Sequence, residues 1–451
     1  MSELRVKFLD ARCCSPAELA VELRREMRMF FSSQEESVRR IIADVFERGD
    51  EAVVEYERKY GWSNCSADRF MVSDEEIEEA VRSVDEDVLS SLKFAMRELE
   101  RYHMRNAPVS SFEHTIDGSI FAELVSPVQS VLIYAPGGRA AYPSTVLHVG
   151  VPAMVAGVRR IYVTTPPDKD GFVHPAILVA AKLIGAKAVY RIGGAHAIAA
   201  FAFGTKSIPK VDMIAGPGGI YVVAAKRLLY GVVGIDLLPG PSEVFIIADD
   251  TADAELVAVD MLAQAEHGED SAAVLATPSE KLIIHVREEL SRLLKGMERS
   301  RVALEALNSF GAFILTATLD EAVEVCNEYA PEHVELHCSG WREVILKIRN
   351  AGAIFVCGTP TAYGDYAAGP SHVLPTLGAA KFSSGLSVES FLKKTRCVSL
   401  SNERILGMGE HVKRLAELEG LHYHALSVEA RLKRLKGEQK EPAMNNGDSN
   451  A

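Results

Sequence analysis

The sequence predicts an α/β protein with two Rossmann-like, doubly wound parallel-sheet domains and helical segments at both ends of the chain. Three observations predict this class. Short apolar, β-branched runs recur along the chain, and each is closed by Gly or Pro. Ala-rich stretches of helical length separate these runs. The runs are continuously apolar rather than alternating, which is typical of parallel strands that helices cover on both faces.

The first hundred residues are predicted to be helical. Residues 1–30 are expected to form an N-terminal helical segment. Ser73 and Glu76 have the spacing of a capping box, and apolar residues then recur at roughly helical spacing. We therefore expect a long amphipathic helix that runs from this box toward Tyr102.

Nine apolar runs follow in two series. SVLIYAPGG, RIYVTTPP, AVYRIGG and VDMIAGPGG form the first, and EVFIIADDT, AAVLAT, GAFILTAT, HVELHC and GAIFVCG form the second. The expected first α/β domain combines residues 31–133 with 243–386, and the second comprises residues 134–242. Residues 387–437 are expected to form a C-terminal helical segment. Residues 438–451 lack apolar spacing and are expected to be a disordered tail.

Composition favours a soluble globular protein and excludes several other classes. Hydrophobic residues make up 48% of the 451 residues and charged residues 25%, so a disordered or collagen-like chain is excluded. The net charge of -13 has the wrong sign for a nucleic acid or an anionic membrane as main partner. No apolar stretch reaches the ~18 residues of a membrane span, and the start does not resemble a secretory signal. Seven scattered cysteines fit reduced thiols, so we expect a cytoplasmic protein.

The strongest local signal for chemistry is DMLAQAEHGED, where Gln264 and His267 lie three residues apart near a predicted helix end. Residues at this spacing share one face of a helix, so both side chains can reach one ion or ligand. A solvated helix end can show the same pattern, however, so this motif needs support from elsewhere in the chain.

Further acidic and imidazole groups lie beside Gly or Pro, in or next to predicted loops. They occur in Pro-Glu-His at 331–333, Gly-Asp-Tyr at 364–366, Pro-Ser-His at 370–372 and Glu-Gly-Leu-His-Tyr-His at 419–424. Loops at strand ends carry ligand chemistry in open α/β sheets. Glu332 and His333 form a natural acid–base element, because a His titrates near neutrality beside a carboxylate. A single His is more often structural, so the combination carries the prediction.

No dinucleotide fingerprint of the G-x-G-x-x-G type follows a predicted strand, and no P-loop occurs. The nearest features are Gly137-Gly138, Gly193-Gly194 and the run 216–219, each of which follows an apolar run. A phosphate could lie against backbone N–H groups there. Ordinary tight turns would have the same composition.

These motifs resemble the histidinol dehydrogenase family from roughly Glu35 to Arg431. The densest stretches are YAPGGRAAYPSTVL, GIDLLPGPSEVFIIAD, QAEHG, APEHVEL, YGDYAAGPSHVLPT and EGLHYHA. The resemblance implies a zinc-containing, NAD-dependent dehydrogenase that converts L-histidinol to L-histidine through L-histidinal, the last steps of histidine biosynthesis. It also implies one zinc per subunit and a homodimer with shared active sites and intertwined C-terminal segments.

The resemblance also implies roles for individual residues. The zinc ligands would be Gln264, His267, Asp365 and His424; the further substrate-binding residues Ser242, His333, His372 and Glu419; and the cofactor-contacting residues Tyr134, His196 and Gly219. His333 would take the alcohol proton, and Glu332 would activate the water that hydrates the aldehyde. Zinc would position the substrate rather than generate hydroxide. His424 and Glu419 would come from the partner chain.

Three positions depart from the family pattern. His196 stands where the family usually has Gln, Gly219 where it has Asn, and Gly268 where Asp is common. The Gly219 position lacks a side-chain hydrogen bond worth on the order of 0.5–1.5 kcal/mol. These departures bear on NAD affinity.

Three alternative interpretations remain open at this point. The nearest is a related zinc- and NAD-dependent dehydrogenase of another small alcohol, such as a sulfonated diol. The second is a zinc hydrolase in which Glu332 or Glu266 activates water, although such sites usually have three protein ligands rather than four. The third is a non-catalytic binding module.

Overall fold

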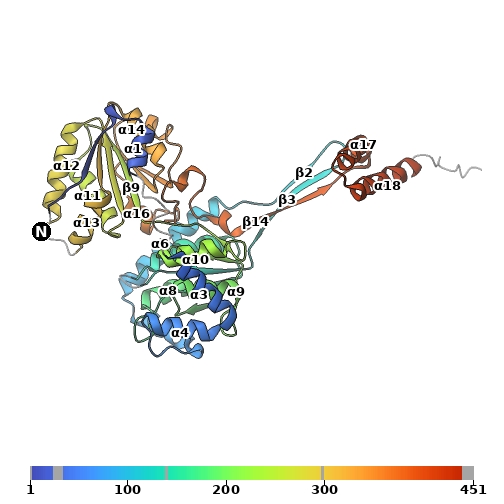
Figure 1. The fold of residues 1–451 in the computed structure, drawn as a ribbon, viewed down its shortest axis with the longest axis horizontal. Coiled ribbons are helices and arrows are strands. Elements are labelled where there is room, and N and C mark those ends of the chain that lie inside the picture. The colour runs from blue at the N-terminus through green and yellow to red at the C-terminus, as the bar shows by residue number, and fades with distance from the viewer. Residues whose placement is uncertain (1–2, 24–33, 138–140, 296–298, 439–451) are drawn as a thin grey trace, which may run out of the picture. The chain divides into compact units, whose positions relative to one another are not determined.

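The computed structural model describes residues 3–23, 34–137, 141–295 and 299–438 (Figure 1). The chain divides into two units. The first comprises Met1–Ala107 and Pro127–Phe391, and the second Pro108–Ser126 and Leu392–Ala451. Among the described residues, no helix combines the length and the apolar character that a membrane span requires.

One parallel sheet of the first unit has five strands in the order β6-β5-β4-β7-β8. Its strands are β4 (Ser130–Tyr134), β5 (Arg160–Thr164), β6 (Ala188–Tyr190), β7 (Met213–Ala215) and β8 (Gly234–Ile235). The helices that follow the first four strands are α7 (Pro143–Val155), α8 (Pro175–Leu183), α9 (Gly194–Phe203) and α10 (Ile220–Leu229). Counted along the chain, the strand order is 3-2-1-4-5, as in a doubly wound Rossmann sheet.

The other parallel sheet of this unit has six strands in the order β1-β11-β10-β9-β12-β13. Its strands are β1 (Lys7–Asp10), β9 (Glu243–Ala248), β10 (Ala272–Thr277), β11 (Ala312–Leu315), β12 (His333–His337) and β13 (Ala353–Val356). Without the edge strand β1, its order is again 3-2-1-4-5. All nine predicted apolar runs therefore contain parallel strands, and the predicted fold class is confirmed.

Helices cover both faces of the six-stranded sheet (Figure 1). Val244 and Ile246 of β9 pack with α11 (Ala254–Ala265), α12 (Glu280–Leu293) and α13 (Ser300–Phe310), whereas Phe245 and Ile247 pack with α1 (Pro16–Leu23) and α14 (Leu319–Tyr329). Successive side chains of a strand point to opposite faces, so a strand buried on both sides must be apolar at every position. The short helix α15 (Trp341–Ile345) adds to the second of these layers.

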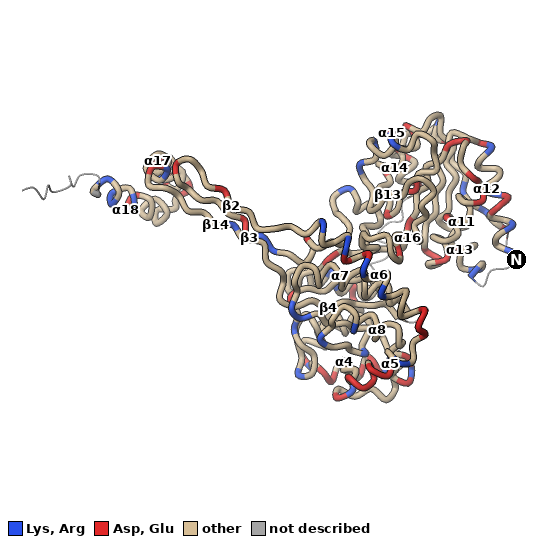
Figure 2. The backbone as a smooth tube through the Cα atoms, turned by 180° about the vertical axis from the view of Figure 1, so that it is seen from behind, with Lys and Arg blue, Asp and Glu red and all other residues tan. Residues whose placement is uncertain are grey.

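The amino-terminal helices are α3 (Glu35–Arg48), α4 (Asp50–Tyr60), α5 (Asp74–Ser83) and α6 (Glu86–Arg105). The capping box of Ser73 and Glu76 is present at the start of α5. The single long helix expected after it is wrong, because the backbone is extended at Val84 and the Asp85 side chain caps a second helix. Acidic residues lie along α5, as Figure 2 shows.

These helices pack on the five-stranded sheet rather than with residues 243–386. Helix α3 contacts α9, α5 contacts α8, and α6 contacts α7. The expected grouping of residues 31–133 with 243–386 therefore differs from the observed packing, because an amphipathic face does not specify which sheet it covers. Residues 1–30 were expected to be helical, but β1 pairs with β11 before α1 begins.

The second unit contains a three-stranded sheet and two helices. The strands β2 (Ser111–His114), β3 (Ile120–Pro127) and β14 (Leu392–Ser399) lie in the order β14-β3-β2, and α17 (Asn402–Leu418) packs against α18 (His422–Glu438). Residues 387–437 were expected to be helical throughout, so β14 corrects that prediction. Its residues are almost all exposed, and it therefore lacks an apolar run. Of the expected tail, residues 439–451 lie outside the described residues.

Candidate active site

The predicted acid–base pair is attached to a single residue of the neighbouring strand. Glu332 precedes β12, and His333 is its first residue. Glu332 Oε2 accepts a hydrogen bond of 2.9 Å from the backbone N–H of Glu243, and His333 Nδ1 lies 3.0 Å from the Glu243 carbonyl oxygen. Because β12 pairs in parallel with β9, where Glu243 lies, the sheet register itself orients both side chains.

The hydrogen bond to the Glu243 carbonyl defines the tautomer of His333. A carbonyl oxygen only accepts, so Nδ1 carries the proton and Nε2 keeps its lone pair. The side chain is 4% exposed, and burial lowers the pKa of His333 below its ordinary value despite the opposing field of Asp365. Near neutral pH this imidazole is therefore uncharged and able to accept a proton at Nε2.

Gln264 and His267 lie at the end of α11. Gln264 is 1% exposed, and within the described part of the chain neither its amide oxygen nor its amide nitrogen has a hydrogen-bond partner. A buried polar group without a hydrogen-bond partner costs about 1–3 kcal/mol of stability. The amide of Gln264 is therefore suited to bind a ligand. His267 is exposed, and its Nδ1 donates to the carbonyl oxygen of Ala263 at 3.0 Å, which leaves Nε2 available.

Asp365 and His372 follow β13. Asp365 lies on the short helix α16 (Thr361–Tyr366), and its carbonyl oxygen accepts a 2.9 Å hydrogen bond from Nδ1 of His372. The other ring nitrogen of His372, Nε2, lies 3.4 Å from the hydroxyl of Thr145 at the start of α7. Burial lowers the pKa of His372, so this ring is also neutral.

The charge interactions among these side chains indicate that they lie close to one another. Asp365 and His267 each act on both His333 and His372. Three separate segments of the chain thus lie in one neighbourhood. Gln264 and His267 were expected near a helix end, and the residues around His333 and Asp365 in or next to loops. His333 opens β12, next to the loop that precedes it, whereas Asp365 lies on the short helix α16.

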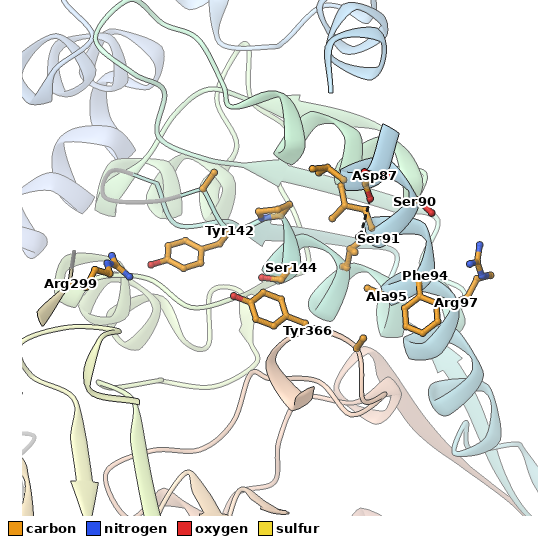
Figure 3. Close-up of a pocket in the computed structure, with 16 residues that line it drawn as sticks. Asp87, Ser90, Ser91, Phe94, Ala95, Arg97, Tyr142, Ser144, Arg299 and Tyr366 are labelled. Atoms are coloured by element: carbon orange, nitrogen blue, oxygen red, sulfur yellow. Dashed lines mark hydrogen bonds between the residues drawn. The ribbon is translucent and has the colours of Figure 1, made fainter. Parts of the chain in front are cut away.

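A cavity of about 910 Å³ opens beside this cluster. Tyr366 and Ala367, which follow Asp365, line it together with Tyr142 and Ser144 from the start of α7. In the close-up of Figure 3, Tyr142, Ser144 and Tyr366 lie near one another, and α6 forms the opposite wall. The cavity thus lies between α6, the start of α7 and the residues that follow Asp365.

The expected cofactor residues lie around the carboxyl-terminal edge of the five-stranded sheet. Tyr134 ends β4, and its hydroxyl accepts a 3.1 Å hydrogen bond from the N–H of Gly194 at the start of α9. Burial raises the pKa of Tyr134 to about 12. His196 lies in the first turn of the same helix, and its Nε2 is 2.8 Å from Oε1 of Glu57. Gly219 caps α10, and there is open space where a Cβ would be.

A second cavity, of about 410 Å³, lies at one of these positions, His196. It is lined by His196, by the backbone of Gly193 and Gly194, and by Tyr221, which follows Gly219 by two residues. Glu57 lines it as well and accepts the Gly193 N–H at 2.7 Å. Tyr60, Trp62 and Tyr221 also line this cavity, and flat aromatic rings of this kind suit the planar bases of a nucleotide.

The loop before Gly219 is held by a buried ion pair. Gly216 has a φ of 107°, and a Cβ there would lie 2.4 Å from the carbonyl oxygen of Tyr134, so only glycine fits. The Asp236 carboxylate accepts a 2.7 Å hydrogen bond from the Gly216 N–H, and Lys226 donates a 2.9 Å hydrogen bond to the carbonyl oxygen of Gly216. Lys226 and Asp236 also pair with each other, and both side chains are fully buried.

The remaining predicted residues are placed as follows. Ser242 is half-buried immediately before β9, and its carbonyl oxygen accepts the Ala272 N–H. Glu419 and His424 belong to the second unit, at the end of α17 and in the first turn of α18, and both are exposed. The side chains of Glu419 and His424 are therefore accessible to solvent within the second unit.

A separate titratable cluster lies on α11 and β12. Asp260, Glu335 and His337 bring their oxygen and nitrogen atoms within 4.8 Å of one another. His337 Nε2 is 3.3 Å from Asp260 and 3.4 Å from Glu335. Burial opposes the charged imidazole, but the two carboxylates outweigh it and raise the pKa of His337 to about 9. The imidazolium thus serves as the cation of this cluster.

Sequence reasoning missed three residues that shape the site. Glu243 supplies the two backbone groups that hold Glu332 and His333. Its signal in the sequence is a charged residue that opens an otherwise apolar, wholly buried strand. Thr145 and His148 are polar residues in the buried, apolar stretch of α7, and both contact His372.

Comparisons with known proteins agree with this geometry. The family model described as histidinol dehydrogenase matches residues 24–432. A histidinol dehydrogenase from Synechococcus sp. is 45% identical over 399 residues, covering 88% of this chain and 92% of the relative. The enzyme from Methanothermobacter thermautotrophicus is 45% identical over 394 residues, covering 87% and 92%.

Among solved structures, histidinol dehydrogenase from Elizabethkingia anophelis superposes with a TM-score of 0.90 at 34% identity. The match covers 97% of this chain and 100% of that one. These similarities extend over both parallel sheets and the second unit. The chain belongs to the histidinol dehydrogenase family.

Proposed function

We propose that this protein is a histidinol dehydrogenase that oxidises L-histidinol to L-histidine through L-histidinal, with NAD as oxidant, in the last steps of histidine biosynthesis. The observation that carries the proposal is the neutral, buried His333, whose Nδ1 is bonded to the Glu243 carbonyl so that Nε2 keeps its lone pair, in the electrostatic field of Asp365 and His267. A proton acceptor thus lies beside a set of metal-ligating side chains. The alternative substrates and reaction classes have no support in the family comparisons.

The side chains at the end of α11 fit a zinc ion. The amide of Gln264 is buried without a partner, and His267 keeps Nε2 available because its Nδ1 is bonded to Ala263. With the carboxylate of Asp365, they offer the nitrogen and oxygen donors that zinc accepts. When bound, zinc would hold the imidazole and amino nitrogens of the substrate and orient its alcohol. Ser242 and His372 would contact the same substrate.

The edge of the five-stranded sheet fits NAD. The 410 Å³ cavity offers the aromatic rings of Tyr60, Trp62 and Tyr221 for stacking with a nucleotide. Tyr134, His196 and Gly219 are the proposed contacts, and Gly219 contributes space rather than a side chain. NAD, when bound, supplies the hydride acceptor for both oxidations.

His333 is the proposed base of both oxidation steps. In the first, its Nε2 takes the proton of the alcohol oxygen while the carbon loses hydride, which leaves the aldehyde. Glu332 then orients and deprotonates the water that adds to the aldehyde carbon. In the second, after His333 has released its first proton to solvent, its Nε2 accepts a proton from the hydrated aldehyde as a second hydride leaves. This yields the carboxylic acid, which ionises to the carboxylate. The carbonyl of Glu243 keeps His333 in the required tautomer throughout.

The site is proposed to be completed by a partner subunit in a homodimer. Its contribution would be Glu419 for the substrate and His424 as the fourth zinc ligand. Exposed apolar side chains on and between α17 and α18 support such an interface, among them Leu415, Leu418 and Leu421. All seven cysteines are free, in keeping with a cytoplasmic location.

The proposal is tested with purified, zinc-loaded protein, NAD and L-histidinol. We expect two NADH for each L-histidinol consumed, and L-histidine as the product on chromatography. Prior treatment with a chelator should abolish the reaction, and added zinc should restore it. The absence of NADH formation under these conditions, with zinc bound, would contradict the proposal.

Shared sites are tested by mixing two inactive variants. We expect H267N and H424N to be inactive alone, and a mixture refolded or exchanged into hybrid dimers to recover activity. Recovery requires that the two ligands of one site come from different chains. A hybrid that stays inactive would place both ligands in the same chain.

A further inference from the structure

His148 is a polar residue in an apolar environment. It lies in the middle of α7, where each residue from Thr145 to Ala153 is buried, and its own side chain has no exposed surface. Buried polar groups cost free energy unless they are hydrogen-bonded. The role of His148 can therefore be inferred from the partners that satisfy its two ring nitrogens.

Both partners of His148 lie on the loop that carries candidate site residues. Its Nδ1 accepts a 3.0 Å hydrogen bond from the backbone N–H of His372. Its Nε2 lies 3.3 Å from the carbonyl oxygen of Tyr366 and donates to it. The imidazole therefore holds the two ends of the 366–372 loop, one with each nitrogen.

The ring of His148 also fixes the plane of His372. The two imidazoles are stacked, with centroids 4.0 Å apart and planes inclined by 5°. The stacked rings share no hydrogen bond, so His148 acts on its neighbour by placement and not by proton transfer. His372 in turn donates from Nδ1 to the carbonyl oxygen of Asp365. Its Nε2 is thereby directed away from the loop, on the side of Thr145.

We propose that His148 is a positioning residue for substrate and metal binding: it sets the relative placement of Asp365 and His372 from the adjoining α/β layer. The inference rests on the proposed function, in which Asp365 is a zinc ligand and His372 contacts the substrate. Its physical basis is rigidity. A single flat ring presents an acceptor and a donor to backbone groups at two ends of one loop, so the loop cannot shift at one end alone.

Three substitutions of His148 separate its contacts. H148M keeps an apolar volume in the core but removes both hydrogen bonds. H148N keeps an acceptor near the position of Nδ1, and H148Q places an amide donor near the position of Nε2. The contact with His372 therefore survives best in H148N, and the contact with Tyr366, which follows Asp365, survives best in H148Q.

The measurements are zinc release to a chelator, followed with a metal indicator, and the KM values for L-histidinol and for NAD. Groups that orient metal ligands typically contribute 10–100-fold to affinity. We expect H148M to release zinc about tenfold faster than wild type and to have a KM for L-histidinol about tenfold higher. Its KM for NAD should stay within about twofold of wild type. H148N should preserve the KM for L-histidinol better than zinc retention, and H148Q should show the reverse.

The matched control is H103L. His103 is a buried histidine of α6 whose Nε2 has no hydrogen-bond partner among the residues that the structure describes, and no hydrogen bond there joins it to Tyr366 or His372. This variant should retain zinc and both KM values. If H148M folds and has the zinc release and KM values of wild type, the inference is overturned. If H148M does not fold, wild-type zinc release and KM values in both H148N and H148Q would overturn it. Because zinc release needs no turnover, this result is distinct from a failure of wild type to oxidise L-histidinol.

Discussion

Apart from the edge strand β1, the two parallel sheets of the first unit have the same strand order, but their candidate site residues lie at opposite edges. In the five-stranded sheet, Tyr134 ends β4 and Gly219 follows β7, so the candidate cofactor contacts lie at the carboxyl-terminal edge. In the six-stranded sheet, Ser242 precedes β9 and His333 begins β12, so the candidate chemistry lies at the amino-terminal edge. Ligands of open α/β sheets usually bind at the carboxyl-terminal edge.

This difference shows that strand order alone does not locate a site. The carboxyl-terminal edge offers helix N-termini, whose N–H groups suit phosphates. The amino-terminal edge offers the last turns of returning helices, and here α11 brings Gln264 and His267 there. Thr145 and His148 of α7 contact His372, so α7 of the five-stranded layer directly adjoins the chemistry of the six-stranded layer.

The largest effect is expected from H333N. Without the base, we expect kcat to fall by about 10²–10⁴-fold, because general-base catalysis contributes on that order. Zinc content should not change, since His333 is held by a backbone carbonyl and is not a proposed ligand. Steady-state NADH formation and metal analysis check this. If H333N retains the full rate, His333 is not the base, and the reaction does not take place at this edge of the six-stranded sheet.

Substitution of Gln264 by Leu tests the metal side of the comparison through stability. Leu removes a buried amide without a partner, so the metal-free variant should be more stable than the metal-free wild type by about 1–3 kcal/mol. Zinc should stabilise the wild type but stabilise the variant far less. Denaturant unfolding with and without zinc measures both effects. Equal stabilisation of the two proteins by zinc would exclude Gln264 as a ligand.

Substitution of Glu57 by Gln tests the cofactor side. The Glu57 carboxylate accepts the Gly193 N–H and contacts His196, so its loss should disturb the start of α9. We expect the KM for NAD to rise about tenfold, which corresponds to about 1.4 kcal/mol, while zinc content is unchanged. E51Q, an exposed change in the same helix, is the control. A rise in KM for L-histidinol alone would break the proposed division between the two edges.

The smallest effect is expected from the pH dependence of stability. The carboxylates of Asp260 and Glu335 outweigh burial and raise the pKa of His337 to about 9. A raised pKa in the folded state stabilises the protein below about pH 6.5, and this stabilisation is lost as the pH rises through 9. The free energy of unfolding should therefore decrease over that interval. In H337Q the decrease should be smaller, and an unchanged pH profile would argue against a charged His337.

Several features could be predicted without the structure, and others could not. The strand runs were found because buried parallel strands are apolar at every position. The exposed strand β14 and the edge strand β1 were missed because neither is buried on both faces. The capping box was found from two residues, but the break at Val84 was missed because the apolar spacing continues across it. The candidate site residues were recognised by resemblance to a family, while their spacing alone left several interpretations open.

By itself the sequence determined two parallel sheets, the helices around them and the residue types available for acid–base and metal chemistry, because these depend on local composition and periodicity. Only the tertiary structure decided which sheet edge each group occupies, which tautomer His333 adopts and that His148 holds the loop of Asp365. These features depend on backbone groups, such as the Glu243 carbonyl and the Tyr366 carbonyl, that are identical in every residue and therefore leave no trace in the sequence.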